Sequence, residues 1–270
     1  MSSEIFKIAL KEVRVLKPRV VVLYHGGEPF VNKNILEMVK QLKLADVKFI
    51  KTVTNGMLLN DDLLFKIIES GLDRIEFSLD GRSAKENDTI RRGCSYSKVS
   101  LTIKKLISAK KYLKRNNPFI CISNCQIPDE NNFDKMPVIA DYILKDFYQY
   151  TNNAELELRA CHSIHWPGYP IARSRYKLNK PNKEKSNYCE HPLKLITIRH
   201  NGDIVACCQD ITSMYILGNI QHHSIRELWN NERYRALRKS IINRDFLPLC
   251  RNCNIVNPNS GLIQSQQPLP

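Results

Sequence analysis

Short runs rich in β-branched residues alternate with stretches of helical spacing along the first 160 residues, and this alternation constrains the fold most. The runs occupy residues 19–25, 47–54, 72–79, 119–127 and 154–161. Between the first two, apolar residues recur at helical spacing, at Ile35, Met38, Val39 and Leu42. Strands that alternate with helices predict a parallel sheet, and the ligand site of such a sheet gathers at the C-terminal strand ends.

Polar turns that contain glycine follow the first three of these runs. The turns are formed by Gly26, Gly27, Glu28 and Pro29, then by Thr54, Asn55 and Gly56, and then by Ser78, Asp80 and Gly81. A single turn of this kind is weak evidence, because Asn-Gly and Asp-Gly form turns in many proteins. Three of them on one rim of a parallel sheet predict one shared site.

The composition changes after the last run, and a second unit is predicted beyond the change. Residues 167–188 are rich in Pro, Lys, Asn and Ser, which indicates a linker or a long loop. Asn201-Gly202 then separates two short apolar runs, and this dipeptide favours the positive φ angles of a tight hairpin turn. Ser224, with Glu227 three residues later, predicts a capping box at the start of a helix.

Four of the nine cysteines have a spacing typical of a metal site. A chain with many cysteines and no secretory signal favours a reducing, cytoplasmic compartment, where thiols serve metals or redox chemistry more often than disulfides. Cys250 and Cys253 can converge on one metal, while Cys207 follows the predicted hairpin and Cys189 precedes it. Four thiolates suit either an iron–sulfur cluster or tetrahedral zinc, and the spacing alone does not choose between them.

The other cysteines are interpreted without a shared ligand. Cys121 and Cys125 lie on one face of a predicted strand, roughly 13 Å apart, so we expect them to pack in the core. Cys94 and Cys161 have no evident partner in the sequence. Cys208 is expected to point away from Cys207.

The net charge of +14 is concentrated in residues 82–115 and 171–200. A solvated Lys-rich surface explains it better than nucleic-acid binding, because no RNA-binding motif accompanies the charge. No apolar run reaches the roughly 18 residues of a membrane span, and residues 1–13 predict an amphipathic helix and not a signal peptide. Neither a membrane nor a nucleic acid is therefore expected as a partner.

The strand-end turns and the C-terminal cysteines together resemble the radical S-adenosylmethionine enzymes that carry a SPASM or twitch-type auxiliary iron–sulfur domain. The resemblance extends from about Val20 to Cys253. It implies an α/β fold with an incomplete (β/α)6-type barrel and a small cysteine-rich C-terminal domain. The implied order is a barrel over residues 1–165, a linker over 166–186, the auxiliary domain over 187–255, and a poorly ordered tail over 256–270.

The resemblance also implies roles for particular residues. Gly26, Gly27, Glu28 and Pro29 look like the motif that binds the methionine part of S-adenosylmethionine, whose ammonium group requires hydrogen-bond acceptors. Thr54 and Asn55 belong beside this cofactor, Ser78 and Asp80 belong to the strand end that reaches its ribose and carboxylate, and Arg159 contacts cofactor or substrate. One auxiliary 4Fe-4S cluster is expected, ligated by Cys189, Cys207, Cys250 and Cys253.

One element of the family pattern is missing from the sequence. The radical-generating cluster of the family is held by a Cys-x3-Cys-x2-Cys loop ahead of the helix that precedes Gly-Gly-Glu-Pro, whereas this chain has no cysteine before Cys94. Residues 1–17 supply that helix and nothing upstream of it. Without these thiolates the chain alone is expected to lack the initiating cluster. Either it is a truncated form of a normal enzyme, which is the explanation we favour, or its initiating loop comes from elsewhere. The missing strand should leave an exposed sheet edge.

In complete form, such an enzyme would cleave S-adenosylmethionine reductively and abstract hydrogen from a peptide or small-molecule substrate. Its electrons would come from a donor such as flavodoxin or ferredoxin. A basic rim favours an anionic substrate, and its members are Arg91, Arg92, Arg173 and Arg175. The alternative is a non-catalytic protein whose four cysteines hold zinc or an electron-transfer cluster.

Overall fold

The fold is described from a computed structural model of the chain, for residues 1–128, 135–152, 155–163, 166, 176–178, 184–257 and 262–264. The chain divides into two compact units that interleave along the sequence. The first, here called the sheet unit, consists of Val13–Gln126 and Met136–His162. The second, here called the cysteine unit, consists of Met1–Glu12, Ile127–Lys135 and Ser163–Pro270. The domain boundaries expected from the sequence stay predictions.

The sheet unit is built on a five-stranded parallel sheet, as the alternating pattern predicts. Its order is β1-β2-β3-β4-β5, and every pair is parallel. The strands are β1 (Val20–Val22), β2 (Phe49–Thr54), β3 (Arg74–Asp80), β4 (Phe119–Gln126) and β5 (Leu156–His162). Among the described strands, β1 and β5 each have one neighbour, so the sheet is open, which agrees with an incomplete barrel.

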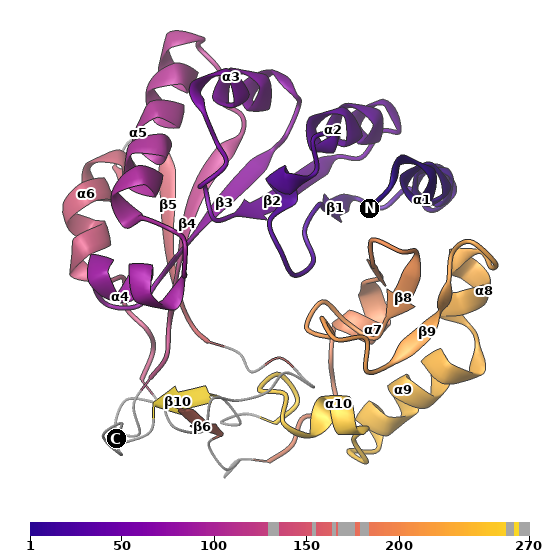
Figure 1. Cartoon of the computed structure of the whole chain (residues 1–270). Coiled ribbons are helices and arrows are strands. Elements are labelled where there is room, and N and C mark those ends of the chain that lie inside the picture. Colours follow the sequence, from indigo (N-terminus) through magenta and orange to yellow (C-terminus); the bar gives the residue numbers. More distant parts are fainter. Residues whose placement is uncertain are drawn as a thin grey trace. The chain divides into compact units, whose positions relative to one another are not determined.

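Helices connect these strands and lie along one side of the sheet (Figure 1). They are η1 (Pro29–Val31), α2 (Ile35–Leu44), α3 (Asp61–Glu69), α4 (Ala84–Ile90), α5 (Tyr96–Tyr112) and α6 (Asp141–Thr151). Strand side chains alternate between the two faces of a sheet. On β3, Ile75, Phe77 and Leu79 share one face and are fully buried, which places the apolar core under the helices.

The other face of the sheet is polar, which is unusual because parallel sheets are ordinarily covered on both sides by apolar packing. Arg74, Glu76, Ser78 and Asp80 alternate with the buried apolar residues of β3 and therefore share this second face. The strand register aligns this row with alternate residues of β4 and β5. We call this surface of β2 to β5 the polar face.

The cysteine unit packs a short antiparallel sheet against helices. Its elements are the first part of α1 (Ser3–Leu16), β6 (Tyr176–Leu178), α7 (His191–Lys194), β7 (Thr197–Ile198), β8 (Asp203–Val205), β9 (Ile216–Asn219), α8 (Ile225–Trp229), α9 (Glu232–Ile242), α10 (Pro248–Arg251) and β10 (Leu262–Gln264). Strands β7, β8 and β9 form one sheet, and β6 pairs with β10. Ile5 and Ala9 of α1 pack into the same core as Ile204, Leu217 and Leu228.

Three local predictions in this unit are confirmed. The helix expected at the start of the chain is α1. The hairpin joins β7 to β8 in antiparallel register, and its Gly202 adopts a φ of +89° that favours glycine. Ser224 and Glu227 form both hydrogen bonds of the capping box at α8.

Two further points concern the ends of the chain and the membrane. The predicted linker over 166–186 and the tail over 256–270 fall mostly outside the described residues. Within the described ranges, no helix combines the length and apolarity that a membrane span requires.

Candidate functional site

The Glu28 carboxylate joins two of the strand-end turns. Its Oε1 accepts hydrogen bonds from the amide of Phe30 at 3.1 Å and from the hydroxyl of Thr54 at 2.8 Å. Its Oε2 accepts one from the amide of Asn55 at 2.8 Å. A carboxylate offers about four acceptor positions, so these three bonds fix its orientation and leave one position for a ligand. The structure thus brings the Gly-Gly-Glu-Pro turn to the end of β2.

The two glycines before Glu28 expose their backbone. Gly26 has a φ of +55° and Gly27 a φ of +129°, conformations that side chains with a Cβ rarely adopt. A Cβ built on Gly27 would meet no atom within 4 Å, so the space beside the turn is open. Glycine is therefore favoured here by the backbone conformation and not by crowding. Both residues are exposed, and their carbonyls can therefore accept hydrogen bonds from a ligand. Pro29 follows as the first residue of η1 and is half-buried.

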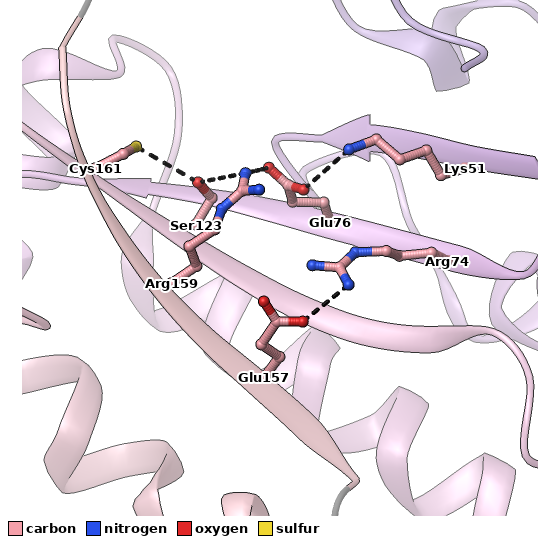
Figure 2. A network of polar contacts seen from close by, with 7 residues as sticks. All are labelled: Lys51, Arg74, Glu76, Ser123, Glu157, Arg159 and Cys161. Atoms are coloured by element: carbon pink, nitrogen blue, oxygen red, sulfur yellow. Dashed lines mark hydrogen bonds and ion pairs between the residues drawn. The ribbon is translucent and has the colours of Figure 1, made fainter. Parts of the chain in front are cut away.

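A network of ion pairs occupies the polar face (Figure 2). One carboxylate oxygen of Glu76 forms an ion pair with the Arg159 guanidinium at 2.6 Å, and the other forms one with the Lys51 ammonium at 3.5 Å. Arg159 also approaches the hydroxyl of Ser123 at 3.4 Å. The Glu76 side chain is only 6% exposed, and a carboxylate so buried requires compensating cations. Arg159, expected to contact cofactor or substrate, is thus committed in part to Glu76.

Asp80 lies farther along the same face and retains one free oxygen. Its Oδ2 pairs with the Arg91 guanidinium at 2.8 Å, and its amide donates to Asn87 at 2.8 Å. Its Oδ1 is buried and has no hydrogen-bond partner among the described residues. Burial raises the pKa of Asp80, although Arg91 opposes the change. Ser78 is half-buried beside it, so a ligand hydroxyl group has suitable partners here.

The Cys94 thiol is close enough to both Glu28 and Asp80 to respond to their charges. Burial raises the pKa of Cys94, Arg91 lowers it, and the negative charges of Glu28 and Asp80 raise it further. The turn that carries Glu28 and the strand end that carries Asp80 therefore surround one region of the sheet unit. Sequence reasoning assigned no role to Cys94, because nothing near it in the sequence indicates these neighbours.

In the cysteine unit, the four cysteines expected to bind a cluster line a single cavity. The cavity has an empty volume of about 390 Å³, part of it open to solvent, and Cys189, Cys207, Cys250 and Cys253 all line it. Burial raises the pKa of Cys207 and of Cys250 to about 12, and neighbouring cysteines add to the effect. Binding of iron or zinc would have to displace these protons, as thiolate ligation requires.

The four cysteines share one cavity, and four thiolates suit either a cluster or a single tetrahedral ion. Cys208 is exposed and does not line the cavity. Its sulfur lies 3.8 Å from the ring of His191.

Comparison with family models gives two matches that correspond to the two kinds of site. Residues 3–122 match the radical SAM superfamily, and residues 189–254 match SPASM, an iron–sulfur cluster-binding domain. The chain belongs to the radical SAM superfamily. It is a SPASM-containing member of this enzyme superfamily, whose cofactors are S-adenosylmethionine and 4Fe-4S clusters.

Individual proteins similar to this radical SAM chain support the same assignment. The tungsten-containing aldehyde ferredoxin oxidoreductase cofactor-modifying protein of Pyrococcus furiosus is 24% identical, over 88% of this chain and 75% of its own length. The fold resembles BtrN in complex with AdoMet and 2-DOIA, with a TM-score of 0.59, 17% identity, and coverage of 99% and 83% of the two chains. It also resembles native anSMEcpe with bound AdoMet and Cp18Cys peptide, with a TM-score of 0.57, 15% identity, and coverage of 97% and 84%.

The interpretation of Cys125 and Cys161 from the sequence was wrong in part. The two residues are register partners on β4 and β5, so their side chains lie side by side on one face and Cys161 does have a neighbouring cysteine. Cys125 is half-buried and lies in this pair, whereas Cys121 is fully buried as expected. The sequence placed Cys121 and Cys125 on one face of their strand, but only the register of β4 with β5 brings Cys125 and Cys161 together.

Proposed function

We propose that this radical SAM chain binds S-adenosylmethionine at the strand-end turns of the sheet unit and holds one auxiliary 4Fe-4S cluster in the cysteine cavity. In a complete enzyme that also holds the radical-generating cluster, reductive cleavage of S-adenosylmethionine, with an electron from a donor such as flavodoxin or ferredoxin, would supply the radical that abstracts hydrogen from the substrate. The residues of this chain bind and orient the reactants.

The observation that carries the cofactor site is the fixed Glu28 carboxylate. Thr54 and Asn55 hold it at the end of β2, and one acceptor position remains for an ammonium group. The exposed carbonyls of Gly26 and Gly27 offer further acceptors next to it. The buried, unpartnered Oδ1 of Asp80 suits a ribose hydroxyl, because a hydroxyl donor would satisfy an otherwise unpaired polar atom.

For the auxiliary cluster, the support is the shared cavity of Cys189, Cys207, Cys250 and Cys253. Four thiolates would give each iron of the cluster a protein ligand. The rest of the lining is largely apolar, with residues such as Leu237, Leu249 and Val256, which limits solvent access to a bound cluster.

The substrate is proposed to be a peptide or a small molecule, since the two structural neighbours have 2-DOIA and a peptide bound. The charges of the polar face are largely balanced, because Glu76 pairs with Lys51 and Arg159. Of the arginines that favoured an anionic substrate, Arg91 is paired with Asp80, whereas Arg173 and Arg175 lie outside the described residues. The preference for an anion therefore stays a prediction.

Calorimetric titration with S-adenosylmethionine tests the cofactor site. We expect Glu28→Ala to weaken binding at least about tenfold, because one charge-assisted hydrogen bond and the orientation of the turn are lost. Asp80→Asn keeps an acceptor oxygen and should weaken binding less. Glu37→Ala is the matched control, since Glu37 is exposed on α2 and accepts a hydrogen bond from Gln41 of the same helix. Equal affinities for Glu28→Ala and Glu37→Ala would refute the proposed site.

Metal and sulfide analysis of anaerobically prepared protein tests the auxiliary cluster. We expect about four irons and about four sulfides per chain. Cys207→Ser should lose much of this content, while Cys208→Ser, which changes a thiol outside the cavity, should keep it. One zinc without inorganic sulfide would favour the alternative of a four-cysteine zinc protein.

A further inference from the structure

Cys125 and Cys161 lie directly opposite each other near the C-terminal ends of two paired strands. They are register partners on β4 and β5 and therefore point to the same face of the sheet, the polar face. Neighbouring strands are about 4.8 Å apart, and disulfides join Cα atoms about 4.4–6.8 Å apart. The backbone thus already spaces the two cysteines for a covalent bond. Both are free thiols and both are half-buried.

The surroundings make the two thiols chemically unequal. Cys125 lies beside Cys161 in register, and the Ser123 hydroxyl lies 3.8 Å from the Cys161 sulfur (Figure 2). The neighbouring thiol and hydroxyl, with the positive charge of Arg159, lower the pKa of Cys161 to about 6 against the effects of burial and of Asp80. The neighbouring Cys161 and burial raise the pKa of Cys125. One sulfur is thus a thiolate near neutral pH, and its neighbour holds a proton.

We propose that Cys125 and Cys161 are a redox-active dithiol that exchanges with small disulfides, with Cys161 as the attacking sulfur and Cys125 as the resolving sulfur. The Cys161 thiolate attacks a disulfide RSSR, forms a mixed disulfide with one R–S group, and releases the other as a thiolate. Cys125 then loses its proton to the released thiolate and attacks the Cys161 sulfur. The second R–S group leaves and takes a proton from solvent.

The electrons and atoms of this exchange balance. Two protein thiols are oxidised to one Cys125–Cys161 disulfide, and one RSSR is reduced to two RSH. The reverse exchange with thiols restores the dithiol. The site is distinct from the cysteine cavity and does not rest on the proposed binding of S-adenosylmethionine, so the two proposals can fail independently.

Cys121 gives an internal comparison in the same strand. It lies on the same face of β4, but its register partner is Glu157 and it is fully buried. Burial raises its pKa to about 11. Cys161 therefore has a larger thiolate fraction than Cys121 at neutral pH, and it is also less buried. We expect Cys161 to react at least about tenfold faster than Cys121.

The full chain is loaded with iron and sulfide and then treated with oxidised glutathione under anaerobic conditions. Its disulfides are identified by peptide mapping without reduction. We expect a cross-linked pair of peptides that contains Cys125 and Cys161. Cys125→Ser should instead trap a stable glutathione mixed disulfide on Cys161, since no resolving thiol remains. Cys161→Ser should leave Cys125 unmodified, and Cys121→Ser should behave as the unchanged chain.

Two results would overturn the proposal. In the Cys125→Ser variant, modification of Cys161 no faster than that of Cys121 would exclude an activated thiol. In the unchanged chain, glutathione on Cys125 and Cys161 separately, without the cross-link, would exclude a resolving role for Cys125. The cross-link is measured in the unchanged chain, and the trapped mixed disulfide is measured in Cys125→Ser. Poor folding of the variant therefore leaves the cross-link result decisive.

Discussion

Arg159→Ala should destabilise the polar face because it leaves a buried carboxylate short of cations. Glu76 is 6% exposed and its closest cation is Arg159, at 2.6 Å. Lys51, at 3.5 Å, would be the remaining partner. Removing one member of a buried ion pair costs about 3–5 kcal/mol. Arg159 itself is 47% exposed, so water can enter the space it leaves, and with Lys51 still present we expect a loss of about 2 kcal/mol.

Amide hydrogen exchange followed by mass spectrometry measures this loss locally. A loss of about 2 kcal/mol corresponds to roughly 30-fold faster exchange when opening is at equilibrium. The acceleration should be confined to peptides from β2, β3, β4 and β5, which carry the network. Peptides of the cysteine unit serve as an internal reference, since the substitution removes no contact within that unit.

Two variants separate the charge argument from a general loss of packing. Glu76→Gln removes the buried charge, so adding Arg159→Ala to it should cost less than about 0.5 kcal/mol. Lys48→Ala breaks a pair whose two side chains are 67% and 78% exposed, and should change stability by no more than about 0.5 kcal/mol. The reasoning is wrong if Arg159→Ala accelerates exchange less than about threefold, or if its effect is undiminished in the Glu76→Gln background.

Three further predictions concern the cap of α8, the half-buried carboxylate of Asp146 and Gly218. Ser224→Ala removes the capping box of α8 and should lower the free energy of unfolding by about 1 kcal/mol in urea, followed by tryptophan fluorescence. Burial raises the pKa of Asp146, but hydrogen bonds, chiefly from Tyr96, outweigh burial and lower the pKa below its usual value. The stabilisation from Asp146 is therefore present above the unfolded pKa near 4 and is lost as pH falls through the folded pKa. Asp146→Asn should therefore destabilise at pH 7 and much less near pH 2, and an equal effect at both pH values would refute this assignment. Gly218→Ala places a Cβ 2.3 Å from Leu228 at a φ of +151° and should lower the melting temperature by several degrees, whereas an unchanged melt would show that the site relaxes freely.

Local chemistry in the sequence predicted much of the secondary structure. The β-branched runs mark all five strands of the parallel sheet, with bounds that differ by at most three residues at either end. The hairpin at Asn201-Gly202 and the cap at Ser224 depend on neighbouring residues only, so both could be predicted without knowledge of the fold. The four cavity-lining cysteines were found because metal ligands follow recognisable spacings.

Features that depend on tertiary register could not be predicted in the same way. The contact of Cys125 with Cys161 requires that β4 and β5 pair in one particular alignment, and a shift by one residue would turn the two thiols to opposite faces. Glu76 looks like an ordinary charged residue in its strand, and the cations that make its burial possible, Lys51 and Arg159, lie 25 and 83 positions away. Asn124 is fully buried, donating to the carbonyls of Leu79 and Gly81, a role that no local pattern indicates.

The helix α1 has a consequence for the order in which the chain can fold during synthesis. Its residues Ile5 and Ala9 belong to the core that also contains Ile204 and Leu228, and Glu12 accepts a hydrogen bond from the amide of Ile225, 213 positions later. Ribosomes deliver the chain at roughly 5–20 residues per second, so this amphipathic segment leaves the exit tunnel many seconds before its packing partners exist. During that interval its apolar stripe has no packing partner, so this hydrophobic core closes late, after residues more than 200 positions apart have both been synthesised.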